Sequence, residues 1–303
     1  MHALWMVLAA FFFASMGVCI KAASPYFNPG EMVFYRGVIG MAMMIWLARR
    51  QGTSLKTRYP GMHAWRSLIG VTSLVAWFYA IAHLPLATAM TLNYMSSVWI
   101  AVFLMGAALW AWRPSPEAPR PPLQGSLVGT IIVGFIGVVL LLRPSIQQEQ
   151  AFAGMLGLMS GMASAFAYMQ VVALSRIGEP ETRTVFYFAM GSAAAGAVTM
   201  MVTGISPWAG WNTLWLIPIG VLASIAQLCL TKAYAQAKTS RETLVVANLQ
   251  YSGIIFGAIS GMVFFGDIIP PLGWAGMFLI IASGITATVL RARSAPDAPN
   301  EEV

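Results

Sequence analysis

The sequence predicts an all-α polytopic membrane protein whose ten transmembrane helices form two inverted five-helix repeats. This prediction rests on the composition, on recurring apolar windows and on an internal repeat. Of the 303 residues, 58% are hydrophobic and 9% are charged, whereas soluble domains carry roughly 25% charged residues. Apolar windows of about 18 to 25 residues, the length that crosses a bilayer core about 30 Å thick, recur along the whole chain.

The apolar windows define the expected spans. They cover residues 3–22, 31–48, 65–83, 86–111, 123–142, 153–175, 183–203, 213–236, 241–265 and 271–291. Before the second span, Asn28, Pro29 and Glu31 have the order of a capping box with proline at the first helical position. The first span lacks the basic leader of a signal peptide, so we expect it to be retained as a helix.

Positive charges orient the spans, because cytoplasmic loops are enriched in Lys and Arg. With ten spans, both termini and the loops after the second, fourth, sixth and eighth spans share one side. That side holds Arg49, Arg50, Lys56, Arg58, Arg66, Arg113, Arg120, Arg176, Arg183, Lys232, Lys238, Arg241, Arg291 and Arg293. Lys21 and Arg143 lie on the opposite side. Both termini are therefore expected in the cytoplasm. The net charge of +7 follows from this bias, and we expect it to favour contact with anionic lipid headgroups rather than binding of nucleic acid.

An internal repeat relates the two halves of the chain. Residues 33–35 recur at 185–187, with a shift of 152. The set Tyr79, Asn93 and Ser97 recurs as Tyr234, Asn248 and Ser252, with a shift of 155. The pair Gly129 and Gly137 recurs as Gly276 and Gly284, with a shift of 147. Each half holds five spans, an odd number, so the second half enters the membrane in the opposite orientation. Inverted repeats place a binding site near the midplane and permit alternating access.

The sequence resembles members of the drug/metabolite transporter superfamily that have two EamA-type domains. The features that carry the resemblance are residues 78–82, 92–94, 265–267 and 276–280, together with Gly284. The resemblance covers residues 3–143 and 153–291, which would be the two repeats, with 292–303 as a cytoplasmic tail. It implies an exporter of aromatic and other apolar amino acids such as Phe, Tyr, Trp and Met, with a cavity lined by helices 1, 3, 4, 6, 8 and 9.

Three positions depart from the pattern of the superfamily. Many relatives have a proline in the fourth and ninth helices where this chain has Ser96 and Tyr251, which weakens the expectation of a kink there. The acid after the ninth helix is usually glutamate and here is Asp267. Arg36 has no charged counterpart in the second half, where Phe188 occupies the matching position.

Polar side chains inside a bilayer are costly unless they face a cavity or a partner, so they mark a candidate pathway. The candidate substrate-binding residues are Tyr79, His83, Asn93, Ser97, Trp99, Tyr168, Gln227, Tyr234, Asn248, Tyr251 and Ser252. We expect their rings to pack on an apolar side chain and their amides and hydroxyls to hold an amino group and a carboxylate. The alternative is that these groups only form hydrogen bonds between helices.

Arg36 is the one charge that the sequence places deep inside a span. Insertion of an arginine at the centre of a helix costs roughly 2.5–3.5 kcal/mol. Its role stays open between a structural pair with Glu31, snorkelling to the interface, and contact with a substrate anion.

Other functions fit the sequence less well. His2, His63 and His83 form no metal motif, and no two acids lie within one turn inside a span, so neither an enzyme nor a metal or other cofactor is expected. A solute channel and exporters of other metabolites or hydrophobic drugs remain the alternatives. A drug cation would require an acid at the cavity centre, and a nucleotide sugar would require several basic residues where only Arg36 qualifies. The expected partners are therefore an amino-acid solute and the lipid of a bacterial cytoplasmic membrane, with the chain a monomer or a homodimer.

Overall fold

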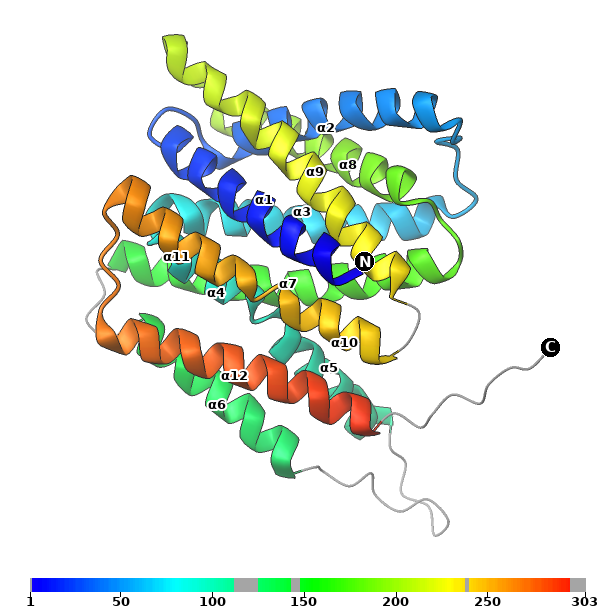
Figure 1. Cartoon of the computed structure of the whole chain (residues 1–303). Coiled ribbons are helices and arrows are strands. Elements are labelled where there is room, and N and C mark those ends of the chain that lie inside the picture. Colours follow the sequence, from blue (N-terminus) through cyan, green and yellow to red (C-terminus); the bar gives the residue numbers. More distant parts are fainter. Residues whose placement is uncertain (1, 112–124, 143–147, 238–239, 295–303) are drawn as a thin grey trace, which may run out of the picture.

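A computed structural model describes residues 2–111, 125–142, 148–237 and 240–294, which form helices and turns with no strand among them (Figure 1). The helices are α1 His2–Ala23, α2 Pro29–Gln51, α3 Pro60–His83, α4 Leu86–Tyr94, α5 Ser96–Ala111, α6 Gly125–Leu142, α7 Gln148–Arg176, α8 Glu181–Thr203, η1 Gly210–Trp215, α9 Leu216–Gln236, α10 Ser240–Leu249, α11 Ser252–Phe265 and α12 Pro271–Ser294. The tail beyond residue 294 lies outside the described residues.

Eight helical stretches of the described chain are long and apolar enough to cross a membrane. The fourth and fifth expected spans are not among them. The fourth is divided into α4 and α5, and the apolar part of the fifth, Val128–Leu141, is shorter. The capping box expected before the second span is present, because Asn28 Oδ1 accepts from the Glu31 amide and Glu31 Oε2 accepts from the Asn28 amide.

The helices pair lengthwise in a regular way. Figure 1 shows α2 running along α8, α12 along α6 and α1 along α9, and α3 packs in the same manner on α7. Small residues allow the backbones to approach: a Cβ added to Gly37 of α2 would overlap the backbone of Ala193 in α8, and one added to Gly137 of α6 would lie 2.9 Å from the carbonyl oxygen of Gly276 in α12. Small-residue contacts of this kind are typical of helices in membranes.

The expected fourth and ninth spans each break near their middle. α4 gives way to α5 at Met95, and α10 gives way to α11 at Gln250 and Tyr251. Neither break contains a proline, but Ser96-Ser97 and Ser252-Gly253 are pairs of the small residues at which helices also kink. The two breaks touch, since Gln250 Nε2 donates to Ser97 Oγ at 3.0 Å.

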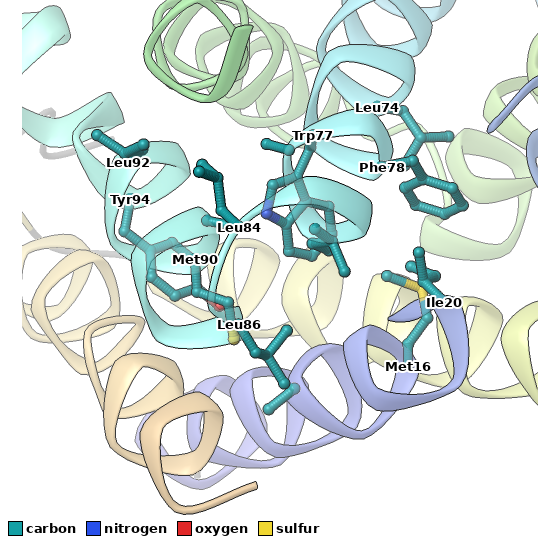
Figure 2. Packing of buried hydrophobic residues seen from close by; sticks show 14 of the residues in the cluster. Met16, Ile20, Leu74, Trp77, Phe78, Leu84, Leu86, Met90, Leu92 and Tyr94 are labelled. Atoms are coloured by element: carbon teal, nitrogen blue, oxygen red, sulfur yellow. The ribbon is translucent and has the colours of Figure 1, made fainter. Parts of the chain in front are cut away.

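Apolar side chains from α1, α3 and α4 fill the centre of the molecule beside these breaks. Figure 2 shows Met16 and Ile20 of α1 in one cluster with Trp77 and Phe78 of α3 and with Leu86 of α4 and its neighbours. Burial of a side chain of this size is worth roughly 1.5–3 kcal/mol relative to water. In a membrane protein, however, the contribution comes mainly from close packing. The cluster fixes α4 and hence the polar residues at its end.

Asp267 and Glu179 each tie segments together at one end of the bundle. At the end where α1 stops and α4 starts, Asp267 bonds to Lys21 Nζ at 2.7 and 2.8 Å and accepts from the Leu86 amide at 2.9 Å. At the end where α3 and α8 start, Glu179 bonds to His63 Nε2 and to Arg183 Nη1, each at 3.1 Å. Loops distant in sequence are thereby tied together at both ends.

Candidate functional site: a central cavity with two arginines

A cavity of about 60 Å³ lies between the helices of both halves. Seven helices line it: α1, α2, α3, α4, α7, α8 and α9. Its wall includes Phe13, Arg36, Arg66, Gly70, Ser73, Trp77, Asn93, Tyr94, Ser164, Tyr168, Phe188 and Gln227. A water molecule needs about 10–15 Å³ measured in the same way, so the space holds a few waters and is too small for a larger solute.

Arg36 of α2 and Arg66 of α3 converge on this cavity. Arg36 is 4% exposed and Arg66 is 3% exposed. Their guanidinium carbons lie 4.9 Å and 4.1 Å from the centre of the Phe188 ring, within cation–π distance. Arg36 Nη1 also donates to Ser192 Oγ at 3.2 Å. The two positive charges therefore share one aromatic partner.

The position of Arg66 contradicts two expectations from the sequence. It was expected among the cytoplasmic loop residues, and Arg36 was expected to be the only basic residue at the centre. In the structure α3 begins at Pro60, five residues before the expected start, so Arg66 lies in its second turn. The guanidinium lies along α3 beside Gly70, where a Cβ would overlap it. A long side chain that starts near the helix end thus reaches the cavity.

A serine cluster on α7 positions the Asn93 side chain at the end of α4. Asn93 Nδ2 donates to Ser160 Oγ at 3.0 Å and to Ser164 Oγ at 3.1 Å. Ser73 of α3 joins the same cluster, with its Oγ 2.7 Å from Ser164 Oγ. Hydrogen bonds satisfy these buried polar groups and hold three helices in register.

Four of the twelve polar residues singled out from the sequence line the cavity: Arg36, Asn93, Tyr168 and Gln227. Tyr234 is adjacent, with its ring centre 6.4 Å from that of Tyr168. Ser97 and Tyr251 lie at the helix breaks, where Ser97 bonds to Gln250 and the Tyr251 ring lies 6.5 Å from Tyr94.

The remaining candidates lie elsewhere. Tyr79 and His83 stack on each other near the end of α3, with ring centres 4.1 Å apart. Trp99 packs against Phe103 and Phe135. Ser252 Oγ donates to the Leu249 carbonyl, and Asn248 is outside the cavity wall. The equivalence of Asn93 and Asn248 in the repeat therefore does not extend to equal positions at the cavity.

Among the wall residues that we did not predict from the sequence, Phe188 could have been predicted from the internal repeat. The internal repeat matches position 36 with position 188. Because α2 and α8 pack antiparallel, matched positions lie near each other only close to the point where the helices cross, as positions 36 and 188 do. Ser164 also had a signal, since Ser160 and Ser164 are one turn apart on α7 and so share a face. For Phe13 and Trp77, the sequence offers no sign of a place in the cavity wall beyond their apolar character.

A larger groove of about 1080 Å³ runs between α3 and α8. Its walls are mostly apolar and include Tyr79, and they also include Leu68 and Val198, which are 62% and 60% exposed on the outside of the bundle. An apolar groove open to the outside of a membrane protein faces lipid. The buried polar groups lie instead in the central cavity, which is the candidate site.

Known proteins provide independent evidence on the class of this chain. Residues 1–108 match the EamA-like transporter family. The chain is 28% identical to the pseudopaline exporter CntI of Pseudomonas aeruginosa over 92% of this chain and 93% of that protein. It is 25% identical to a riboflavin transporter of Rhizobium johnstonii over 93% of this chain and 89% of the relative.

A solved crystal structure with 18% sequence identity shares the fold, with a TM-score of 0.65 over 97% of this chain and 99% of the other. The family match and the two relatives are transporters, and they agree with the apolar helices of the described chain. The chain is a multi-pass membrane protein that is similar to transporters of the EamA type. The relatives named here differ in the solutes that their names give, so their names do not identify a solute for this chain.

Proposed function

We propose that this chain is a secondary transporter of the drug/metabolite transporter superfamily that exports a small amino-acid-like solute from a bacterium by alternating access. In this proposal ten spans form two inverted repeats, residues 3–143 and 153–291, in the cytoplasmic membrane. The fourth span consists of α4 and α5, and the ninth of α10 and α11. Both termini lie in the cytoplasm.

The pairing of helices supports the inverted repeats. If span n of the first half corresponds to span n + 5, then the α2–α8 and α6–α12 pairs each map onto themselves, and the α1–α9 pair maps onto α3–α7. These are the pairs that pack lengthwise in the structure. The breaks in the fourth and ninth spans also fall at matching places, since α4 ends at Tyr94 and α10 ends at Leu249.

The two carboxylate clusters support the alternation of the loops. Asp267 joins the end of α1 to the start of α4, and both lie on the external side in the proposed topology. Glu179 joins the loops before α3 and before α8, and both lie on the cytoplasmic side. A missing or extra span between these points would place one member of a cluster on the wrong side of the membrane.

The observation that carries the transport proposal is the small central cavity, lined by buried polar and aromatic side chains from helices of both halves. A carrier requires such a site for its solute, whereas a channel requires a continuous pore. The cavity offers guanidinium groups for a carboxylate, and the rings of Phe13, Trp77 and Tyr94 for an apolar part. These features are why we favour a carrier over a channel and an amino-acid-like solute over a hydrophobic drug.

Counterflow in proteoliposomes tests the proposal. Liposomes preloaded with one unlabelled amino acid are expected to accumulate the labelled form transiently and saturably, which a channel cannot produce. Asn93→Ala, which removes an amide from the cavity, should raise KM or lower the rate by about tenfold. Asn248→Ala is the matched control, because it makes the same change at the equivalent repeat position away from the cavity.

Absence of counterflow for every amino acid tested, with folded native protein, would refute amino-acid-like transport. Equal loss in Asn93→Ala and Asn248→Ala would refute the assignment of the cavity as the site.

A further inference from the structure

Arg36 and Arg66 carry charges that the surrounding protein leaves uncompensated. Among the described residues, no carboxylate lies within salt-bridge distance of either guanidinium; the described ion pairs instead use Asp267 with Lys21, and Glu179 with His63 and Arg183. Arg36 Nε, Arg66 Nε and Arg66 Nη1 are buried without a hydrogen-bond partner among these residues. The wall residues that the structure describes include no acidic side chain.

An uncompensated pair of this kind is unfavourable in the protein without solute. Each arginine loses most of its hydration at 3–4% exposure, and the two like charges repel across the ring that they share. The Phe188 face offsets a part of this cost, since a cation–π contact is worth about 2 kcal/mol when desolvated. Both side chains line the cavity, and a bound anion there would give partners to donors that the protein leaves without one.

We infer that the transported solute carries two anionic groups, carboxylates or phosphates, that are held by Arg36 and Arg66. This inference rests on the proposed function and narrows its solute class. A neutral amino acid has a single carboxylate and would leave one guanidinium unpaired, so apolar amino acids are poorer solutes than their acidic counterparts. Asn93, Gln227 and Tyr168 then face the uncharged polar part of the solute.

Matched pairs of solutes test the number of anionic groups. Glutamate is compared with glutamine and succinate with succinamate, because the members of each pair differ by one carboxylate and little in shape. 3-Phosphoglycerate is compared with glycerate, so that a phosphate takes the place of the second carboxylate and the two kinds of anionic group are distinguished. Two readouts are used: counterflow in proteoliposomes, and the rise in Tm of the detergent-solubilised protein on addition of the solute. The member with two anionic groups is expected, in at least one pair, to exceed its partner about tenfold in apparent affinity in both readouts.

Neutral variants test which residues are responsible. Arg66→Gln and Arg36→Gln should each reduce the affinity for the solute with two anionic groups about tenfold or more and leave that for its partner with one anionic group within about twofold. Because each removes an uncompensated charge, neither should lower Tm without solute. Arg50→Gln is the matched control: Arg50 also lies over a ring, 4.5 Å from the centre of Trp46, but is exposed and far from the cavity.

The outcomes separate the two proposals. Counterflow of both members of every pair with equal affinity would overturn the inference of two anionic groups and leave the transport proposal intact. Tm shifts specific to dianions without counterflow of any solute would uphold the anion site and count against transport. A lower Tm in both Arg36→Gln and Arg66→Gln, with unchanged solute preference, would assign the arginines a structural role and overturn the inference. No Tm shift with any dianion would also overturn it.

Discussion

Glu179 illustrates how much one side chain outside the membrane spans can hold together. Its carboxylate accepts from Thr57 Oγ1 at 3.0 Å and bonds to His63 and Arg183. Burial raises the pKa of this carboxyl, but the hydrogen bonds from His63, Thr57 and Arg183 lower it by more, so the net pKa lies below its ordinary value. The ionised form is therefore the one that the folded protein favours.

The pH dependence of stability follows from this shift. A carboxyl with a depressed folded pKa contributes stability above its unfolded pKa, about 4.3 for glutamate, and that contribution is lost as the pH falls through the folded pKa. We expect Glu179→Gln to destabilise the protein by about 2 kcal/mol at pH 7, and the difference from native protein to shrink below about pH 4. Thermal unfolding in detergent between pH 3.5 and 7 measures this.

Glu181→Gln is the control, because it removes a carboxylate two residues further along, in the first turn of α8, without breaking the cluster. A difference between native protein and Glu179→Gln that stays constant with pH would show that the charge of Glu179 does not stabilise the fold.

The residues of the cavity were only partly predictable from the sequence. Asn93 and Gln227 stood out because an amide in an apolar helix has few satisfactory environments. Arg66 did not, because it lies close to a helix end, and from there an arginine reaches either the interface or the interior with nearly equal ease. The choice depended on where α3 begins and on the space beside Gly70, which only the fold determines.

Among the helices, α4 and α7 form the contact on which the position of Asn93 depends. Gly161 of α7 lies against the backbone of α4: an added Cβ would overlap the Leu92 carbonyl oxygen and lie 3.0 Å from that of Asn93. Backbone cannot move aside as a side chain can. The glycine is thus required for close packing rather than for backbone conformation.

Gly161→Ala should destabilise the protein by about 1–3 kcal/mol and weaken transport, because it pushes α4 away from the serines that hold Asn93. Thermal unfolding and counterflow measure the two effects. Gly129→Ala in α6 is the control, since a Cβ there meets nothing within 4 Å. Equal Tm for both variants would show that α4 and α7 are less tightly packed than described.

The helix breaks show where sequence reasoning about elements succeeded and where it failed. The long apolar windows indicated helices at the right places, since apolar length is a strong signal. The replacement of the usual prolines by Ser96 and Tyr251 argued against a kink, yet both spans break. Serine and glycine neighbours permit a break, and whether it occurs depends on contacts such as that between Gln250 and Ser97.

For the molecule as a whole, Asp267 closes one end of the bundle. Its bonds to Lys21 and to the Leu86 amide join α1, α4 and the loop after α11, which belong to both halves. The side chains of Lys21 and Asp267 are 17% and 12% exposed, so water screens the pair only in part. In the proposed alternating access, we expect opening of the cavity toward this end to separate at least one of these contacts.

Asp267→Asn should therefore favour the state that is open at this end. Loss of about 1 kcal/mol of closing energy changes a population about fivefold. A cysteine at Ala167, a small residue of the cavity wall, is expected to react about fivefold faster with a membrane-impermeant maleimide added outside. Lys56→Asn, a change at an exposed lysine in the loop between α2 and α3, is the control. An unchanged rate would remove Asp267 from the closure.

Access to the cavity from each side of the membrane tests the account most directly. In protein with Cys19→Ala and Cys229→Ala, single cysteines replace Ala167 in the cavity, Lys56 in the loop between α2 and α3, and Ile268 in the loop between α11 and α12. The impermeant maleimide is applied to intact cells and to inside-out vesicles. Inverted repeats with alternating access predict that the cysteine at 56 reacts only in vesicles, that at 268 only in cells, and that at 167 in both. Reaction of 56 and 268 from the same side, or of 167 from one side alone, would contradict the account.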